Sequence, residues 1–307
     1  MESKRDKSLR LLTVNDGLIL CPVCKETLHA NDDYTMTCTN GHSFDISKKG
    51  ILNLVGKSND KLYDNTLFLN RRQVINNGNY DPLITRISEL LHKYVTASTN
   101  HLRIIDAGCG EGSFFNAICQ VNDNETSNGK AKETNSHVGI DLSREGINLA
   151  SDHGSDIIWL IDDLANIHIK DRAFDVLLNI LSPANYSQFK RVLDNDGIII
   201  KVVPGKDYLR EIRNVLRYDQ DTYNTNGIYD NTKTMEHTMK EMSIIHNEKM
   251  NYHLDIPADE FDRFIKMTPL THGKDALMPL GKHTLATPSK KIYGLTIDLE
   301  ILVGRPF

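Results

Sequence analysis

The sequence predicts an α/β protein with a mainly parallel, doubly wound (Rossmann-like) sheet, preceded by a small N-terminal unit of different character. From about residue 62, short apolar runs alternate with helix-length segments, a pattern typical of strands buried on both faces between layers of helices. The first 60 residues are instead rich in turn formers and short on helical periodicity. A loop-rich unit of that size cannot bury enough core by itself and usually needs a bound metal or covalent cross-links to stay folded. We therefore expect two domains, residues 1–60 and residues 61–307.

The elements of the second domain follow in order along the chain. Five apolar runs predict the buried strands of the sheet: 102–105, 138–140, 157–161, 174–178 and 198–203. Helix-length segments at 146–151 and 187–193 lie between them. The polar segment 122–136 predicts an exposed insertion loop. Near the C-terminus, strands at 243–246 and 292–303 are expected on either side of an amphipathic helix at 260–266.

Composition excludes several classes of protein. Of the 307 residues, 25% are charged and 39% hydrophobic, as in globular proteins. No apolar run reaches the roughly 18–20 residues that span a bilayer, and no apolar signal segment follows the charged N-terminus, so we expect a cytoplasmic protein. Five cysteines do not suggest a disulfide framework. The net charge of −5 is, taken alone, weak evidence against a nucleic-acid partner.

A cluster of metal-ligand residues lies in the N-terminal unit. Cys21 and Cys24 form a Cys-x2-Cys turn, and Cys38 and His42 follow across a short hairpin. Three thiolates and an imidazole at this spacing can close a tetrahedron around zinc, and four protein ligands leave no open position for catalysis. The alternatives are ordinary reduced cysteines or a redox pair, which has no need of a second Cys/His pair. We expect a structural zinc site.

A glycine-rich loop follows the first strand of the predicted sheet. Gly108, Gly110 and Gly112 lie between that strand and a helix, where glycines let a ligand approach the backbone closely. Asp106 precedes the loop and Glu111 lies within it. Acids beside a pyrophosphate would repel it, whereas they suit the cationic sulfonium and ammonium groups of S-adenosylmethionine. We read Cys109, inside the loop, as a small buried residue and not a nucleophile.

Acidic residues also end the next two strands. Asp141 is placed to bind the ribose hydroxyls of such a cofactor, and Asp163 offers an acceptor for the adenine amino group. Together with the loop, these acids predict a class I S-adenosylmethionine-dependent methyltransferase fold. The alternative is another nucleotide-binding sheet.

The combination of the N-terminal cluster and the glycine-rich loop resembles the RlmA family, whose members are 23S ribosomal RNA (guanine-N1-)-methyltransferases. Further matching stretches occur in the same order: 41–45, 49–54, 71–72, 78–83, 204–205 and 267–269. The resemblance implies a zinc domain that grips RNA, a guanine in a hairpin loop of domain II of the rRNA as substrate, and a homodimer. It also makes Tyr80 and Tyr208 candidate cofactor contacts, with packing of the aromatic rings as the alternative.

Basic residues cluster at two places that could contact RNA. Pro204-Gly205 is expected to open a helix that carries four cations on one face: Lys206, Arg210, Arg213 and Arg217. Arg71 and Arg72, before the glycine-rich loop, are the second candidate site. The alternative for both is simple solvation. Because many acids face the cofactor while the cations cluster, the net charge says little about the partner.

For this reaction class, the residue that assists deprotonation of the target base still has to be identified. Guanine N1 carries a proton at neutral pH, so a base or a donor to O6 should lie near the target. The segment 179–183, after the fourth strand, offers amide and hydroxyl groups but no strong base, and no catalytic residue is assigned. Two other functions compete with the RNA methyltransferase: a small-molecule methyltransferase with an accessory zinc domain, and a zinc-dependent RNA-binding module with an inactive methyltransferase fold.

Overall fold

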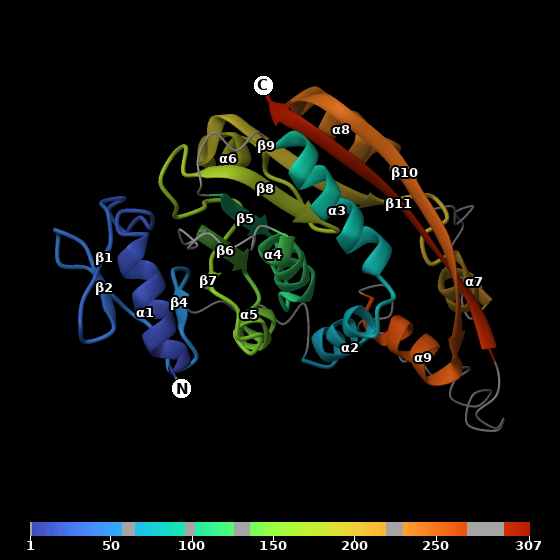
Figure 1. Ribbon diagram of the computed structural model, residues 1–307, viewed down its shortest axis with the longest axis horizontal. Coiled ribbons are helices and arrows are strands. Elements are labelled where there is room, and N and C mark those ends of the chain that lie inside the picture. Colours follow the sequence, from blue (N-terminus) through green and yellow to red (C-terminus); the bar gives the residue numbers. More distant parts are fainter. Residues whose placement is uncertain (1, 57–64, 96–101, 126–135, 219–229, 269–291) are drawn as a thin grey trace.

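The computed structural model describes residues 2–56, 65–95, 102–125, 136–218, 230–268 and 292–307 (Figure 1). Two sheets organise these residues. A small antiparallel sheet lies in the N-terminal unit, and an eight-stranded sheet runs through the rest of the molecule. Among the described residues, no helix combines the length and the apolar character that crossing a membrane requires.

The large sheet has the order β10-β11-β9-β8-β5-β6-β7-β4. Its strands are β4 (Ile51–Asn53), β5 (Arg103–Ala107), β6 (Ser136–Asp141), β7 (Ile157–Ile161), β8 (Phe174–Ile180), β9 (Leu193–Pro204), β10 (Met242–Pro257) and β11 (Ile292–Pro306). The strands from β9 to β4 in this order are parallel, whereas β11 runs antiparallel to both β9 and β10. Strand order reverses between β5 and β8, and ligands of open α/β sheets bind at the carboxyl ends of the strands beside such a point.

Both faces of the central strands are buried, which explains their nearly continuous apolar sequences. Successive side chains of a strand point to opposite faces. In β5, Ile104 therefore belongs to one hydrophobic cluster and Ile105 to the other. The first cluster includes apolar residues of α3, α4, α5 and α9, and the second those of α1 and α6 (Figure 1). The parallel sheet between two helical layers is confirmed.

The helices that build these layers alternate with the strands. In chain order they are α1 (Lys4–Val14), α2 (Asn65–Asn76), α3 (Asp81–Tyr94), α4 (Ser113–Glu125), α5 (Arg144–Ala150), α6 (Tyr186–Val192), α7 (Arg210–Tyr218), α8 (Thr232–Glu241) and α9 (Ala258–Lys266). The last of these confirms the amphipathic helix expected at 260–266.

The N-terminal unit packs directly on the large sheet. Its own sheet consists of β1 (His29–Ala30), β2 (Thr35–Thr37) and β3 (Ser43–Asp45). Strand β4 pairs with β7 at the sheet edge, and an isolated bridge joins Ile19 to Ile169. Residues before position 60 thus complete the edge of the large sheet. The domain boundary expected at residue 60 falls outside the described residues and stays a prediction.

Four helices lie where none was expected: α1, α2, α3 and α8. Helix α1 occupies the segment expected to lack helical periodicity, and it buries only a short stretch, Ser8, Leu11 and Leu12, among charged residues. Helix α2 contains Arg71 and Arg72, the pair for which only a basic cluster was predicted. The insertion loop was also wrong at its ends, because α4 continues to Glu125 and β6 begins at Ser136. The residues between them lie outside the described part.

The expected start of the basic helix was wrong. The helix α7 begins at Arg210, so Lys206 precedes it. The Gly205 N–H donates to the Asp298 carbonyl and the Leu209 N–H donates to the Thr296 carbonyl, so strand β11 holds this segment outside a helix. Strands β10 and β11 are both longer than predicted. Along β10, at the sheet edge, half-exposed side chains alternate with exposed ones, and this alternation is hidden in the sequence because many of these residues are polar.

Candidate active site and metal centre

A cavity of about 560 Å³ lies at the carboxyl ends of the central strands. Every central strand or the segment after it contributes to the wall: Gly108–Glu111 after β5, Asp141 at the end of β6, Asp163 after β7, Ile180–Pro183 at the end of β8, and Pro204 at the end of β9. Its volume lies within the range of small-molecule and cofactor sites. The reversal of strand order therefore coincides with a ligand-sized cavity.

The glycines of the loop are required by their surroundings. Gly108 has φ +84°, and a Cβ atom there would overlap the hydroxyl of Ser182. Gly112 has φ +80°, and its Cβ would lie 2.7 Å from a ring carbon of Trp159. Both the backbone conformation and the close contacts exclude larger residues. The loop is thus packed from behind while Gly110 faces the cavity.

Asp106 places an unpartnered carboxylate in the cavity wall. Its side chain is 2% exposed, and Oδ1 has no hydrogen-bond partner among the described residues. Burial, together with the nearby Asp141 carboxylate, raises the pKa of Asp106 well above its ordinary value. A buried acceptor of this kind needs a donor or a cation. The ammonium group of S-adenosylmethionine fits that requirement.

The other acids have different surroundings. Asp141 accepts hydrogen bonds from the backbone N–H groups of Gly110 and Ser143, each at 2.8 Å, so it fixes the loop as well as lining the cavity. Glu111 is 1% exposed, and its carboxylate accepts a bond from the Ser113 hydroxyl at 2.6 Å. Glu111 is therefore already engaged within the loop, while Asp141 is the acid that joins loop and cavity.

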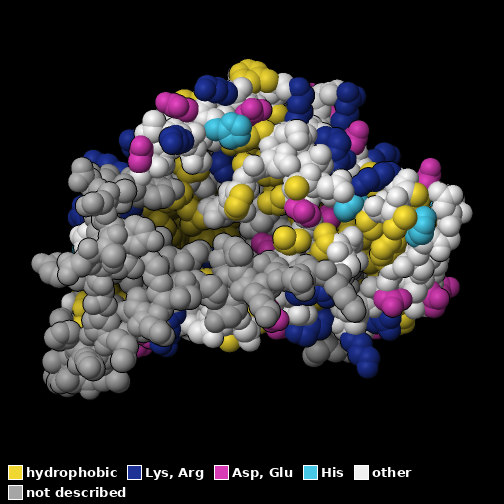
Figure 2. All heavy atoms as spheres, turned by 180° about the vertical axis from the view of Figure 1, so that it is seen from behind, with side chains coloured by type: hydrophobic (Ala, Val, Ile, Leu, Met, Phe, Trp, Pro, Cys, Tyr) yellow, Lys and Arg dark blue, Asp and Glu magenta, His cyan; other side chains and the backbone are white. Residues whose placement is uncertain are grey.

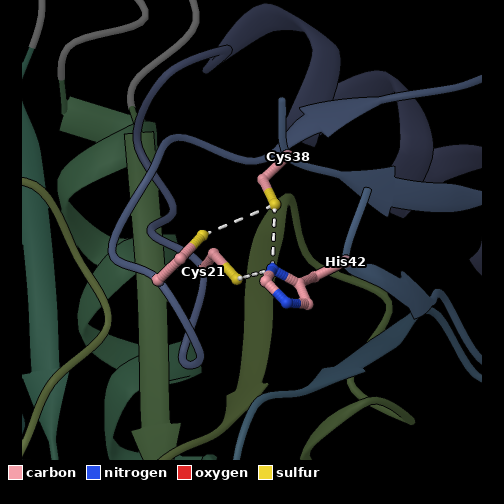
Figure 3. Close-up of side chains that lie close together, drawn as sticks. Cys21, Cys38 and His42 are labelled. Atoms are coloured by element: carbon pink, nitrogen blue, oxygen red, sulfur yellow. Dashed lines mark hydrogen bonds between the residues drawn. The ribbon is translucent and has the colours of Figure 1, made fainter. Parts of the chain in front are cut away.

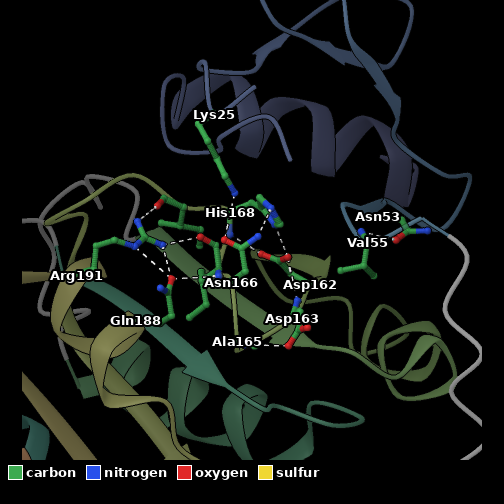
Figure 4. A network of polar contacts seen from close by, with 12 residues as sticks. Lys25, Asn53, Val55, Asp162, Asp163, Ala165, Asn166, His168, Gln188 and Arg191 are labelled. Atoms are coloured by element: carbon green, nitrogen blue, oxygen red, sulfur yellow. Dashed lines mark hydrogen bonds and ion pairs between the residues drawn. The ribbon is translucent and has the colours of Figure 1, made fainter. Parts of the chain in front are cut away.

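Asp162 and Asp163 are adjacent in sequence, but their side chains make different contacts. Asp162 is fully buried and bonds the imidazole of His168 at 2.7 Å (Figure 4). Asp163 lines the cavity and accepts a bond from the Ala165 N–H at 2.8 Å. From His168 the network continues through Asn166 to Lys25 of the N-terminal unit. The acceptor expected for adenine thus stands at the end of a chain of contacts that begins in the metal-binding unit.

Two tyrosines from distant elements meet in the cavity wall. The hydroxyls of Tyr80 and Tyr208 lie 2.6 Å apart, and the Phe114 ring packs edge-on against Tyr80. Burial raises the pKa of both phenols, so they stay protonated and can donate hydrogen bonds. The cavity wall therefore brings the two tyrosines together, and their mutual contact is also a packing contact.

A buried lysine supports the strand end opposite the glycine-rich loop. Lys201 is 2% exposed, and its ammonium donates to the Asn179 side chain at 2.5 Å and to the Ser182 carbonyl at 3.3 Å. Asn179 in turn donates to the carbonyls of Ala107 and Pro183. Burial lowers the pKa of Lys201 to about 8. These contacts connect the residue before the loop with the segment after β8.

Cys109 differs slightly from expectation. Its thiol is not fully buried but half-buried, and it lines the cavity. Burial raises its pKa well above the ordinary value, with smaller effects from the neighbouring acids. The thiol stays protonated, which agrees with the expectation that it is not a nucleophile.

The four N-terminal ligand residues converge on one point. Their ligand atoms lie within 4.8 Å of one another, with the Cys24 and Cys38 sulfurs 3.6 Å apart and the Cys38 sulfur 3.4 Å from His42 Nδ1 (Figure 3). Bonds of about 2.0–2.3 Å in a tetrahedron imply such spacings. A hydrogen bond from Asn40 is the main cause that lowers the pKa of Cys24 to about 6, which favours the thiolate form that binds metal. The donor set fits structural zinc.

The hairpin between β2 and β3 explains this convergence. Cys38 directly follows β2 and His42 directly precedes β3, and the Cys38 N–H donates to the His42 carbonyl. Gly41, with φ +81°, makes the reversal between them. The spacing read from the sequence is thus a property of one tight turn.

Comparisons with known proteins find matches for both parts of the chain. Residues 19–57 match the family model described as RlmA, N-terminal, and residues 98–251 match a methyltransferase-domain model. The Bacillus subtilis protein YxjB, named as a candidate 23S rRNA (guanine-N(1)-)-methyltransferase, is 35% identical over 95% of this chain and 98% of its own. The chain belongs to the RlmA family of 23S rRNA (guanine-N1-)-methyltransferases.

Two further comparisons extend this result. The 23S rRNA (guanine(748)-N(1))-methyltransferase of Streptomyces fradiae is 23% identical to this RlmA-family chain. The match covers 93% of this chain and 96% of the Streptomyces protein. A solved structure of loganic acid methyltransferase with SAH has a TM-score of 0.52 at 11% identity, and the match covers 82% of this chain and 98% of that one. The second likeness shows the fold alone, which is the class I methyltransferase fold.

The basic residues of this RlmA-family protein do not form one surface. Arg72 is directed inward, where it bonds the Leu149 carbonyl at 2.5 Å and lies 3.4 Å from Glu111. Arg71 lines the cavity. Lys206 and Arg210 are exposed, whereas Arg213 donates to the Lys206 carbonyl. Arg217 belongs to α7, but its side chain is outside the described part. Seen from behind, positive and negative side chains are interspersed (Figure 2).

Sequence reasoning missed several cavity residues. Phe68, Leu142, Leu164 and Met267 contribute apolar wall, and no local pattern distinguishes them from core residues. Lys201 supports the wall through Asn179 and Ser182 without lining the cavity. It did leave a signal in the sequence, because it is the single charge within the apolar run of strand β9. A lone charge in a buried strand indicates a specific internal partner.

Proposed function

We propose that this protein transfers the methyl group of S-adenosylmethionine to N1 of a guanine in a hairpin loop of 23S rRNA. The observation that carries the proposal is the cavity at the strand-order reversal, with the unpartnered Asp106 carboxylate in its wall, in a chain of the RlmA family. The name of the Streptomyces relative specifies N1 of a guanine as its target, which supports the choice of atom.

The residues proposed to hold the cofactor lie at or near the carboxyl ends of the strands. Asp163 would accept from the adenine amino group, Asp141 from the ribose hydroxyls, and Asp106 from the ammonium group. The backbone of Gly108, Gly110 and Gly112 allows the close approach, and the hydroxyls of Tyr80 and Tyr208 complete the wall. When bound, S-adenosylmethionine supplies an electrophilic methyl carbon. The protein contributes by holding the nucleophile in line with it.

The target base must leave its stack to reach the cavity. A hairpin-loop guanine is unstacked at lower cost than a base in a duplex, which favours a loop of domain II as the substrate. Phe68, Phe114 and Met267 give the cavity an aromatic and apolar lining that suits a planar base and excludes water. Since N1 must lose its proton, a base or a donor to O6 has to act there, and no side chain is assigned to it.

The N-terminal unit, residues 1–60, is proposed to grip the RNA around its zinc ion. Lys206 and Arg210 would contact phosphates near the cavity, because Pro204, Tyr208 and Leu209 of the same segment line the wall. Arg213 and Arg217 would extend this contact, whereas the inward contacts of Arg72 favour a role in holding the loop. We also propose that the protein acts as a homodimer in the cytoplasm.

The proposal is tested by methyl transfer to rRNA. The purified protein is incubated with labelled S-adenosylmethionine and naked 23S rRNA, and the modified nucleotide is mapped by reverse transcription, which N1-methylguanine blocks. We expect a single stop at a hairpin-loop guanine, absent with Gly110→Arg, in which a long side chain projects toward the cavity. Label in a small metabolite but not in RNA would contradict the proposal and favour a small-molecule methyltransferase. RNA binding without any transfer would favour an inactive binding module.

A further inference from the structure

The wall of the cofactor cavity contains four acidic residues. Asp106, Glu111, Asp141 and Asp163 all line it. Among the described residues in its wall, Arg71 is the one that carries a positive charge. S-adenosylmethionine has the complementary distribution, with a sulfonium and an ammonium cation and a single anionic group, the carboxylate of its methionine part. Acids can receive the two cations, but the carboxylate needs a cation of its own.

Arg71 is held at the glycine-rich loop but lacks an acidic partner. It projects from α2, and its Nη1 lies 3.3 Å from the position that a Cβ atom would take on Gly110. Its Nη2 lies 3.4 Å from the Met267 carbonyl, and the guanidinium is 5.8 Å from the centre of the Phe68 ring. No carboxylate of the described residues lies within 4.0 Å of it. A partly buried guanidinium without an anion is costly unless a ligand supplies one.

The neighbouring arginine provides a contrast. Arg72 is also in α2, yet its guanidinium is already bonded to Glu111 and to the Leu149 carbonyl. The charge of Arg71 also opposes the rise that burial causes in the pKa of Tyr208, although the hydrogen bond with Tyr80 opposes that rise more strongly. Arg71 thus lies beside Gly110 of the loop and shares the cavity wall with the hydrogen-bonded pair Tyr80 and Tyr208, so an anion bound in this cavity could accept hydrogen bonds from Arg71.

We propose that Arg71 binds the carboxylate of the methionine part of S-adenosylmethionine and so fixes the amino-acid end of the cofactor. The inference rests on the proposed function, because it takes that cofactor as the occupant of the cavity. The planar guanidinium can donate two parallel hydrogen bonds to a carboxylate. Arg71 is then a cofactor-positioning residue and not the RNA contact expected from the sequence.

Binding measurements with and without the carboxylate test this assignment. Calorimetry compares S-adenosylmethionine with its decarboxylated analogue on the wild type and on Arg71→Met, in the absence of RNA. In the wild type we expect the analogue to bind about 10- to 100-fold more weakly, the loss typical of a charge-assisted hydrogen-bonded pair. In Arg71→Met we expect the two ligands to bind with nearly equal Kd. Arg71→Lys should restore part of the preference.

The control is Lys190→Met, which removes an exposed cation of α6 and should leave the preference unchanged. Thermal unfolding verifies that each variant is folded, and Arg71→Gln serves if Arg71→Met is not. A folded variant at position 71 that keeps the wild-type preference for the carboxylate would overturn the assignment. That result is distinct from failure of the proposed function, in which the wild type binds neither ligand or methylates no rRNA.

Discussion

The ammonium of Lys201 donates a hydrogen bond to the side-chain carbonyl of Asn179, 2.5 Å away on the neighbouring strand. Both residues are almost completely buried, and no carboxylate of the described residues forms an ion pair with Lys201. Asn179 uses its N–H groups for the carbonyls of Ala107, which precedes the glycine-rich loop, and of Pro183, which follows β8. The pair thus ties the glycine-rich loop to the segment after β8, at the cost of an internal charge.

This cost predicts a specific pH dependence of stability. Burial lowers the pKa of Lys201 from 10.5 to about 8. Below about pH 8 both the folded and the unfolded chain carry the proton, so the contribution is constant. Between about pH 8 and 10.5 the folded protein binds fewer protons than the unfolded chain, so the group adds stability as pH rises, by about 3 kcal/mol.

Urea unfolding at several pH values measures this effect. The free energy of unfolding of Lys201→Met, subtracted from that of the wild type, should leave a difference that grows from pH 8 to 10.5. Subtraction removes the opposing contribution of tyrosines such as Tyr80, whose pKa burial raises. Lys190→Met, at an exposed position of α6, should give a flat difference. A flat difference for Lys201→Met as well would show that the ammonium is not penalised by burial.

Adding one methyl group to the glycine-rich loop should weaken cofactor binding. In Gly108→Ala the new Cβ overlaps the Ser182 hydroxyl, so the loop or the segment after β8 must move. We expect S-adenosylmethionine affinity, measured by calorimetry, to fall at least about 10-fold, because the backbone can no longer approach the ligand closely.

Gly154→Ala separates this effect from backbone strain. Gly154 has a similar φ of +71°, but nothing lies within 4 Å of its Cβ position. Both substitutions should cost about 1–2 kcal/mol of stability through the left-handed conformation. Only Gly108→Ala should weaken cofactor binding. Equal affinities in the two variants would mean that the contact with Ser182 does not shape the cavity.

Much of the core and both sites could be predicted because the signals are local. A parallel strand buried on both faces is apolar throughout, as Ile157–Ile161 shows, and its bounds were predicted without error. The ligand residues Cys38 and His42 belong to one hairpin turn, so their spacing alone fixes their geometry. Acids at strand ends, such as Asp141 and Asp163, meet because parallel strands end at the same edge.

The remaining features depend on contacts between distant segments. Strand β11 holds Gly205 and Leu209 through its own carbonyls, which delays α7 to Arg210, and nothing near these residues in sequence indicates it. Likewise, Arg71 and Arg72 are identical in sequence terms, yet one turns to the cavity and the other to Glu111. The direction of the helix and the partners in the tertiary structure decide where each side chain points. The spacing of residues along the sequence does not indicate these partners.

Loss of the zinc site should affect RNA binding more than cofactor binding. In Cys24→Ser a sulfur ligand is replaced by a hydroxyl, so zinc content should fall well below one ion per chain. We expect the hairpin of β2 and β3 to loosen and rRNA affinity to fall about 10-fold or more in gel-shift titrations. Calorimetric affinity for S-adenosylmethionine should change little, because the cavity lies on other strands.

Cys119→Ser is the matched control for zinc. Cys119 is a buried thiol of α4 outside the metal-ligand cluster, so zinc content and rRNA affinity should stay at the wild-type level. If Cys24→Ser lost its zinc and still bound rRNA as the wild type does, the N-terminal unit would not be a grip for RNA.

The salt dependence of rRNA binding tests the exposed cations near the cavity. Lys206 and Arg210 lie in the segment whose intervening residues, Tyr208 and Leu209, line the cavity wall. Binding of a phosphate by a cation releases counterions, so the slope of log K against log salt should become shallower by about 0.7–0.9 for each phosphate that is no longer bound. We expect Lys206→Glu and Arg210→Glu together to weaken binding and flatten this slope by about 1.5.

Lys190→Glu changes an exposed charge on α6, just before β9 begins at the opposite end of the sheet from the cavity, and should leave the slope as in the wild type. Because all three substitutions reverse a charge, equal slopes for the double variant and the control would show that these two cations are solvated and bind no phosphate.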